Sequence, residues 1–381
     1  MSLIKDFSRR QFFPGDPDTP VDKLFKRSEN LERIPDLIFA LCLFIIAGFP
    51  TFGKWHFTAA LWLFFMLDWL LLILLPRAGK SFGPPKPVVL LLAAFRIVFV
   101  FIPLPLAAFA QVCGTVLVFY GFWIEPHRLT VTYQKLYSDK LTNKEPLRIL
   151  HLGDLHIERI TAREDRLSEL ITSHQPDLIL FSGDVLNLSN LEDRHAWQDA
   201  RQVISKWKAP LGTFLVTGST AVDCEHLMPE IKKDLPVRWL HNERITIQSN
   251  NNLLDIVGLD CTHRPDDDNK TLSHLLDKTN DHFSILLYHS PDLAPHAAQQ
   301  GIDLQLSGHT HGGQVRLPVW GALITASLYG KRYEAGRYQV KDMTLYTTRG
   351  IGMEGGGTPR VRFLCPPEII FWDISPTPDR N

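Results

Sequence analysis

Residues 147–156 read LRILHLGDLH, and residues 177–184 read DLILFSGD. In both stretches a short apolar run ends in Gly-Asp, which is the pattern of a buried strand followed by a turn. Residues 158–175 between them have a helical pattern, so the three segments predict a strand, a helix and a second strand. Asp154 and Asp184 thus end two successive strands, and the α/β class is predicted.

The same alternation continues to the end of the chain. Further strands are predicted in residues 212–219, 252–260, 283–290 and 302–313, and most of them end in a glycine or a polar residue. In open α/β sheets, ligands bind outside the carboxyl ends of the strands. This repeated placement therefore predicts a functional site at the strand ends.

Four of these strand ends carry metal-binding residue types: GDLH at 153–156, GD at 183–184, YHSPD at 288–292 and GHTHGGQ at 308–314. Residues two apart in an extended turn point to the same side, so Asp154 with His156, and His309 with His311, can converge on one cavity. A carboxylate that bridges two cations is needed in a two-metal site, and Asp184 is the natural candidate. Mixed carboxylate and imidazole ligands favour Mn, Fe, Zn or Co over Ca or Mg.

The four segments, in this order, resemble the calcineurin-like metallophosphoesterase family, in particular its bacterial membrane-attached branch, which carries GHTHGGQ and a late RGIG segment (here 349–352). The resemblance covers residues 148–373. It implies a four-layer fold, a double β-sheet sandwich flanked by helices, and hydrolysis of a phosphoester or pyrophosphate bond by a metal-activated hydroxide. It also implies two ligand sets: Asp154, His156, Asp184 and His311 for one metal, and Asp184, His289 and His309 for the other.

One segment departs from the family pattern. Where the family has Gly-Asn-His, with Asn as a ligand of the second metal and His as a catalytic imidazole, residues 218–220 read Gly-Ser-Thr. Ser219 is a weaker neutral ligand, and Thr220 cannot act as an imidazole acid. Either Asp223 or water completes the second metal and catalysis persists, or that metal is weak and activity is lost or narrowed. We favour retained activity, with Asp184 and Asp223 as the catalytic carboxylates.

Two further assignments concern residues outside these segments. Arg349 is predicted to bind phosphate, because a guanidinium can form paired hydrogen bonds with it, although a plain flexible loop is the competing interpretation of this region. His241, His263 and His282 have no motif around them and are interpreted as surface or core residues.

The first third of the chain is strongly apolar. Residues 36–53 and 57–76 are each close to the roughly 20 residues that span a bilayer as a helix. The third apolar stretch, 87–124, is too long for one span and is interrupted by Pro103 and Pro105, so two more helices are predicted. Arg96 lies inside this stretch and needs a partner. The predicted division is a polar segment at 1–34, an all-α transmembrane unit at 35–124, a connector at 125–147 and the phosphoesterase domain at 148–381.

Charge indicates the sidedness of the protein. Basic residues lie before the first span and between the second and third, so both segments are predicted to be cytoplasmic. If the third stretch crosses the membrane twice, the C-terminal domain is cytoplasmic, and if it crosses once, the domain lies outside; we favour the cytoplasm. Lys and Arg total 40 against 41 Asp and Glu, so no nucleic-acid partner is expected.

The predicted substrate is a phosphorylated molecule at the membrane, with a lipid-linked phosphoester or pyrophosphate as one hypothesis. The alternative is a non-catalytic membrane receptor or scaffold that keeps a metal and phosphate pocket. Comparing hydrolysis by the native chain and by Asp184→Asn separates the two hypotheses.

Overall fold

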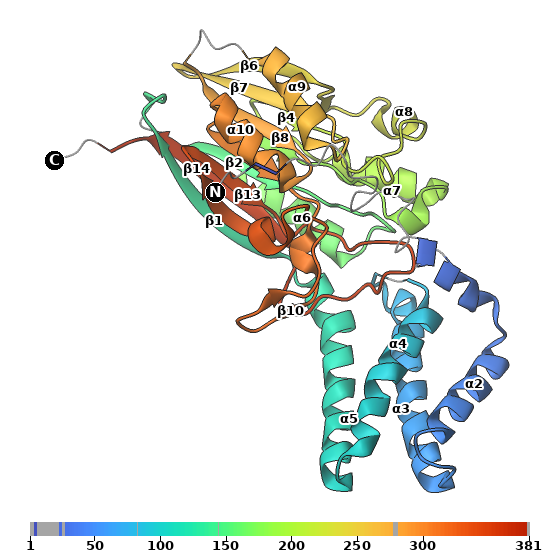
Figure 1. The fold of residues 1–381 in the computed structure, drawn as a ribbon. Helices are drawn as coiled ribbons and strands as arrows, with labels where there is room; N and C mark the ends of the chain where they lie inside the picture. The colour runs from blue at the N-terminus through green and yellow to red at the C-terminus, as the bar shows by residue number, and fades with distance from the viewer. Residues whose placement is uncertain are drawn as a thin grey trace.

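The computed structural model describes residues 4–5, 23–24, 27–81, 83–143, 145–276 and 281–378. Most of the predicted polar segment at 1–34 lies outside these residues. Figure 1 shows two parts: an α/β body, and a group of helices that extends from one side of it.

The α/β body contains two six-stranded sheets. The first has the order β1 (Thr130–Ser138), β14 (Glu368–Pro376), β2 (Leu147–Leu152), β3 (Leu178–Phe181), β4 (Thr213–Leu215), β5 (Arg238–Trp239). The second has the order β12 (Gly336–Val340), β13 (Met343–Thr347), β9 (Leu304–Ser307), β8 (Phe283–Tyr288), β7 (Asn252–Leu259), β6 (Glu243–Ser249).

The sheets and helices form four layers, as predicted. Successive side chains of a strand face opposite sides of its sheet, so Ile149 of β2 faces the second sheet while Leu150 faces the helices. Helices α6 (Ala162–His174) and α7 (Arg194–Ile204) cover the outer face of the first sheet. Helices α9 (Pro265–Leu275) and α10 (Ala294–Gln300) cover the second, and short α8 (Met228–Lys232) lies beside α7.

The predicted connector at 125–147 needs a correction. Residues Thr130 to Ser138 form β1, an edge strand that pairs in parallel with β14 in the register Thr130↔Glu368. Its side chains are mostly exposed or half-buried, so the strand lacks the apolar run by which the buried strands were identified. The α/β body therefore begins before residue 148.

The apolar third of the chain forms α2 (Asp36–Gly48), α3 (Trp55–Leu74), α4 (Pro85–Val98) and α5 (Leu104–Phe119). The break between the last two falls before Pro103, as predicted. Among the described helices, two are long and apolar enough to cross a membrane. One is α3, with 20 residues, and the other is α5 together with the helical turns that continue it to His127, with 24 residues (Leu104–His127). The other two, with 13 and 14 residues, are shorter than a full span.

The charge predicted to need a partner has one. Arg96 of α4 forms a buried ion pair with Asp68 of α3, with 2.6 Å between Nε and Oδ2, and Nη1 donates to the side chain of Gln111 at 2.9 Å. These contacts join three of the helices, and they satisfy a charge that would be costly in a bilayer without a partner.

Buried hydrogen bonds connect the helices to the α/β body. The carboxylate of Glu125, just after α5, accepts the backbone amides of Leu364 and Cys365 at 2.9 and 2.5 Å. Ser81, between α3 and α4, donates to Glu158, which also pairs with Arg360 at 2.9 Å. The orientation of the α/β body on the helices is therefore held at two separate places.

Candidate metal centre

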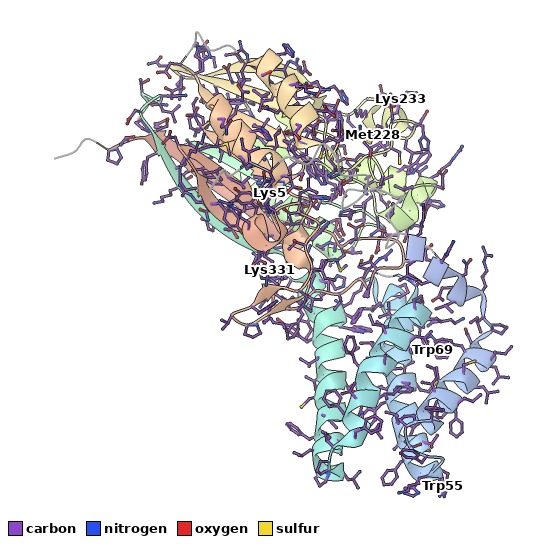
Figure 2. The ribbon with its side chains drawn as sticks, viewed as in Figure 1. Lys5, Trp55, Trp69, Met228, Lys233 and Lys331 are labelled. Carbon is purple, nitrogen blue, oxygen red and sulfur yellow. The ribbon has the colours of Figure 1, made fainter. Side chains whose placement is uncertain are left out.

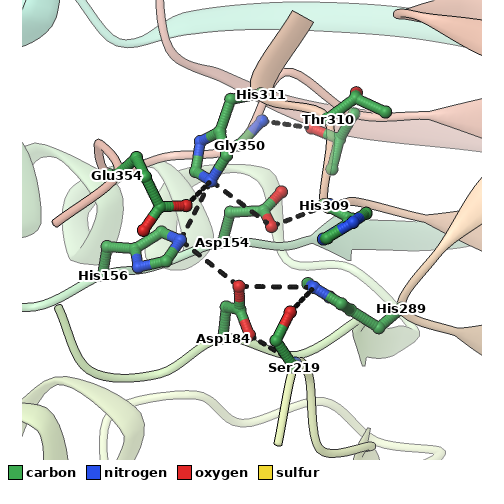
Figure 3. A network of polar contacts seen from close by, with 12 residues as sticks. Asp154, His156, Asp184, Ser219, His289, His309, Thr310, His311, Gly350 and Glu354 are labelled. Carbon is green, nitrogen blue, oxygen red and sulfur yellow. Dashed lines mark hydrogen bonds and ion pairs between the residues drawn. The ribbon is translucent and has the colours of Figure 1, made fainter. Parts of the chain in front are cut away.

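Loops at the carboxyl ends of five strands bring the predicted ligands together (Figure 3). The loops after β2, β3, β4, β8 and β9 contribute in that order: Asp154 and His156, Asp184, Ser219, His289, and His309 and His311. All of these side chains are buried, and they form one cluster where the loops of the two sheets meet.

The first half of the centre contains Asp154, His156 and His311, whose ligand atoms all lie within 4.8 Å of one another. The Nε2 atoms of the two histidines are 2.9 Å apart, and Nε2 of His311 is 3.8 Å from Oδ1 of Asp154. Two imidazole nitrogens and a carboxylate oxygen at this spacing suit one divalent cation.

The second half contains Asp154, Asp184 and His289, which also lie within 4.8 Å of one another. Oδ2 of Asp184 is 3.4 Å from Nε2 of His156 and 3.3 Å from Nε2 of His289, so it lies between the two halves. This is the position that a bridging carboxylate needs. The ring of His309 lies beside that of His289, with 5.0 Å between the centroids.

Buried polar atoms without a partner test whether the cluster fits metal ions. Among the described residues, Oδ2 of Asp154 and Nε2 of His309 are buried and accept or donate no hydrogen bond. Such atoms cost free energy unless a ligand satisfies them. The residues present therefore fit a pair of divalent cations.

The electrostatics of the cluster agree with metal binding. Burial, together with the charge of neighbouring imidazoles, holds the pKa values of His309 and His311 well below the usual range, so both rings are neutral near pH 7. A neutral imidazole has a free nitrogen lone pair, which is the form that binds metals.

Asp184 and His289 behave as a charged pair in the absence of metal. Burial acts to lower the pKa of His289, but the charge of Asp184 and its hydrogen bond outweigh this and raise the pKa to about 9. Burial likewise acts to raise the pKa of the Asp184 carboxyl. The positive charge of His289 outweighs the effect of burial, so the pKa of Asp184 is lowered. A proton on His289 must therefore leave when a cation binds there.

The backbone at the cluster adopts a conformation that few residues populate. Asp154, His156, Asp184, His309 and His311 all have positive φ angles, between 40° and 72°. Left-handed non-glycine residues cluster at functional sites, where the surrounding structure maintains them. Gly308 allows the close approach, because a Cβ there would lie 2.4 Å from Oδ2 of Asp154.

Asp223 supports the turn that carries Asp184. Its two carboxylate oxygens accept the backbone amides of Asp184, Val185 and Gly218 at 2.9, 2.9 and 2.7 Å. A carboxylate engaged by three amides stabilises this turn, and the catalytic role of Asp223 stays a prediction.

Two other predicted residues lie apart from the ligand cluster. The guanidinium of Arg349 forms a 2.6 Å ion pair with buried Glu368, so binding phosphate would require this pair to break; the phosphate role stays a prediction. Thr220 is exposed beside buried Ser219, and it offers no replacement for the family's histidine.

His263 was interpreted as a surface or core residue, but it lines the site. It follows β7, is 7% exposed, and places Nε2 at 3.1 Å from Oγ of Ser219. Its ring lies 4.6 Å from that of His309. The signal that identified the other ligands, a polar residue after an apolar strand, is also present in residues 252–263. Glu354 was missed as well: its Oε2 lies 3.9 Å from Nε2 of His311.

Comparison with known proteins agrees with this geometry. Residues 147–313 match the family described as calcineurin-like phosphoesterase. The chain is 31% identical to the metallophosphoesterase YkuE of Bacillus subtilis over 268 aligned residues. The alignment covers 68% of this chain and 90% of YkuE. It is 30% identical to the phosphodiesterase YaeI of Escherichia coli (61% and 83% covered), and 25% identical to the UDP-2,3-diacylglucosamine pyrophosphatase LpxG of Chlamydia muridarum (72% and 98% covered).

The fold and the buried carboxylate and imidazole cluster are those of a metal-dependent phosphoric ester hydrolase. The chain belongs to the calcineurin-like phosphoesterase family.

Proposed function

We propose that this protein hydrolyses a phosphoester or pyrophosphate bond in a lipid-linked substrate at the membrane surface, with two divalent cations (Mn, Fe, Zn or Co). The observation that carries the proposal is an exposed apolar hairpin at residues 316–322, which follows the ligand segment GHTHGGQ and lies near the end of α5 that meets the body (Figure 1). The proposed ligands are those of the cluster: Asp154, His156, Asp184, Ser219, His289, His309 and His311.

Bound cations would lower the pKa of a water molecule and neutralise charge on the phosphoryl oxygens. Asp184 holds the two halves of the site at a fixed separation, because its Oδ1 accepts the amide of Ser219 at 2.7 Å while Oδ2 faces both His156 and His289. Burial of the cluster excludes bulk water, which strengthens each electrostatic contact with a phosphoryl group.

The hairpin of β10 (Arg316–Leu317) and β11 (Gly321–Ala322) follows the GHTHGGQ segment directly. Its turn and the residues after it expose apolar side chains: Val319 is fully exposed, Ile324 is 80% exposed, and Trp320 is 66% exposed. A group of exposed apolar side chains on a loop marks a binding surface.

The hairpin lies at the level where the helices meet the body (Figure 1). Arg316 donates its amide to the carbonyl of Phe363 at 2.9 Å, and the ring of Phe363 is 6.0 Å from that of Tyr120, at the end of α5. Lys331, labelled on this side of the body in Figure 2, stacks over Trp320 with 4.4 Å to the ring centroid. Trp and Lys are typical of the membrane interface, so the bilayer is the partner we assign to this hairpin.

We infer that α3 and α5 cross the bilayer and that α2 and α4 pack beside them, which makes a multi-pass anchor. Arg77 and Lys80 lie between α3 and α4, and Lys86 lies in the first turn of α4, on the side of the helices that holds the body, whereas Trp55 marks the opposite end (Figure 2). Because Lys and Arg concentrate on the cytoplasmic side, the proposed location of the body is the cytoplasm.

The pyrophosphatase LpxG supports a lipid-linked substrate class, because its name specifies a diacylated sugar nucleotide. A substrate of this class has acyl chains that remain in the bilayer and a diphosphate that must reach the metal centre. The hairpin beside the centre fits such an arrangement.

The test uses the full chain in lipid nanodiscs with added Mn²⁺. Hydrolysis of a diacylated UDP-sugar is compared with hydrolysis of a soluble phosphodiester, for the native chain and for Asp184→Asn. Asp165→Asn, on the exposed side of α6, is the matched control. We expect the lipid substrate to be preferred and Asp184→Asn to be inactive. Hydrolysis of the soluble ester alone contradicts the lipid proposal.

A second candidate function is a receptor that binds phosphate without hydrolysis. The observation that favours it is the Gly-Ser-Thr segment, which removes the family's imidazole and places exposed Thr220 there. Equal background rates for the native chain and Asp184→Asn on every substrate would support this alternative.

A further inference from the structure

Ser219 and His263 form a buried pair at the second half of the metal centre. Nε2 of His263 lies 3.1 Å from Oγ of Ser219, and Nε2 of His289 lies 3.2 Å from the same oxygen. The Ser219 amide also donates to Oδ1 of the bridging Asp184 at 2.7 Å. The Ser219 hydroxyl therefore lies among the proposed ligands of the second cation, at the position where the family resemblance implies asparagine.

A serine hydroxyl is a weak neutral ligand unless its proton is directed away from the metal. A hydroxyl has one proton to donate and two lone pairs to offer. If the proton points to His263, a lone pair is free to face the cation, and the oxygen becomes a stronger donor because an outer hydrogen bond increases its negative charge.

His263 is suited to accept this proton. Its Nε2 lies at hydrogen-bond distance, 3.1 Å, from Oγ of Ser219, while its Nδ1 lies 3.8 Å from Sγ of Cys261, and a neutral imidazole has one nitrogen that accepts a hydrogen bond. Its φ angle of 57° is in the left-handed region that the five left-handed ligands share, although no motif includes it.

The loop that carries His263 is held in place by a chain of hydrogen bonds. Oγ1 of Thr262 donates to Asp268 at 2.7 Å, and the hydroxyl of Tyr288 donates to the same carboxylate at 2.5 Å. Tyr288 directly precedes His289 on β8, so the loop and the second half of the centre share one support.

We propose that His263 is a positioning residue: it accepts a hydrogen bond from Ser219, turns the serine oxygen toward the second cation, and with Ser219 replaces the asparagine ligand of the family. This inference rests on the proposed two-cation function. It explains how a chain without Gly-Asn-His keeps a complete second site.

The test measures bound Mn²⁺ per chain and the affinity of the second ion, by titration of the purified full chain in detergent. The native chain is expected to bind two ions. His263→Ala and Ser219→Ala are each expected to weaken the second ion by about 10- to 100-fold and to leave the first in place. His226→Ala, at an exposed histidine, is the matched control.

The double variant His263→Ala with Ser219→Asn separates positioning from a merely structural role. The asparagine amide needs no imidazole to orient it, and removal of the ring leaves room for the longer side chain, so the second ion should return. A purely structural role for His263 predicts no such rescue.

Three outcomes would overturn the inference. The first is two tightly bound ions in His263→Ala, and the second is a double variant that does not regain the second ion. The third is Ser219→Ala with two ions and His263→Ala with one, which would make His263 itself the ligand. A native chain that binds no metal at all refutes the proposed function instead, so the two failures are distinguishable.

Discussion

Oδ2 of Asp223 accepts the backbone amide of Asp184 at 2.9 Å, which ties the turn of the bridging carboxylate to a residue 39 positions later in the chain. Asp223→Ala leaves three buried amides without an acceptor. We expect a loss of about 3 kcal/mol in the free energy of unfolding, because unsatisfied buried amides each cost on the order of 1–3 kcal/mol. Thermal unfolding of the purified chain measures this.

The control for this change is Asp165→Ala, which removes an exposed carboxylate on α6. It should unfold like the native chain. If Asp223→Ala kept full stability and metal content, the supporting role assigned to this carboxylate would be incorrect.

The apolar hairpin should affect lipid substrates selectively. Val319→Asn with Trp320→Ser removes two exposed apolar side chains without touching the metal centre. Burial of such side chains contributes roughly 1.5–3 kcal/mol each, so KM for a diacylated substrate in vesicles should rise by about tenfold or more. The rate on a soluble phosphodiester should stay unchanged. An equal loss on both substrates would point to damage at the metal centre.

His151 should make the fold sensitive to acid. Burial lowers the pKa of His151 to about 3 in the folded chain, from 6.5. As the pH falls below about 6.5, the unfolded chain takes up the proton first, so this histidine contributes stability at neutral pH that is lost toward pH 3. Between pH 7 and 5 the loss from this group is about 2 kcal/mol.

Unfolding of the metal-free chain at pH 7 and pH 5, with a chelator present, measures this effect. His151→Gln should lose less stability across that interval, since glutamine takes up no proton. The same pH dependence in both chains would show that His151 is protonated in the folded state.

The buried ion pair between helices should show strong coupling. Arg96→Met leaves Asp68 buried without its partner, and removing one member of a buried pair costs about 3–5 kcal/mol. The double variant with Asp68→Leu removes both charges and should recover most of that stability. Thermal unfolding in detergent tests this; additive losses in the double variant would mean that the two charges act independently.

Much of the fold was predictable because apolar runs ending in polar residues mark buried strands. Strands β2, β3, β8 and β9 follow this pattern, whereas the four layers were implied by the resemblance to the family. β1 was missed because an edge strand exposes much of its surface and needs no apolar run. Its place beside β14 depends on a contact between the two ends of the α/β body.

The ligand positions were predictable for a similar reason. Each of the six predicted aspartate and histidine ligands lies in the loop that follows a strand, and the resemblance to the family divided these six between two metals. The role of Asp223 and the position of His263 depend on which loops meet in three dimensions. The partner of Arg96 was not predicted either, because Asp68 lies 28 residues away on another helix.

The position of β14 has a consequence for biosynthesis. β14 is the last strand of the chain, yet it lies between β1 and β2 in the first sheet. When a ribosome makes this chain, the apolar helices emerge before the α/β body, and the sheet stays open until residues 368–376 have left the ribosome. The gap beside β2 is filled last, so the hydrolase assembles only after its apolar helices have already been synthesised. A message truncated before residue 368 would therefore yield the proposed anchor with no assembled enzyme attached.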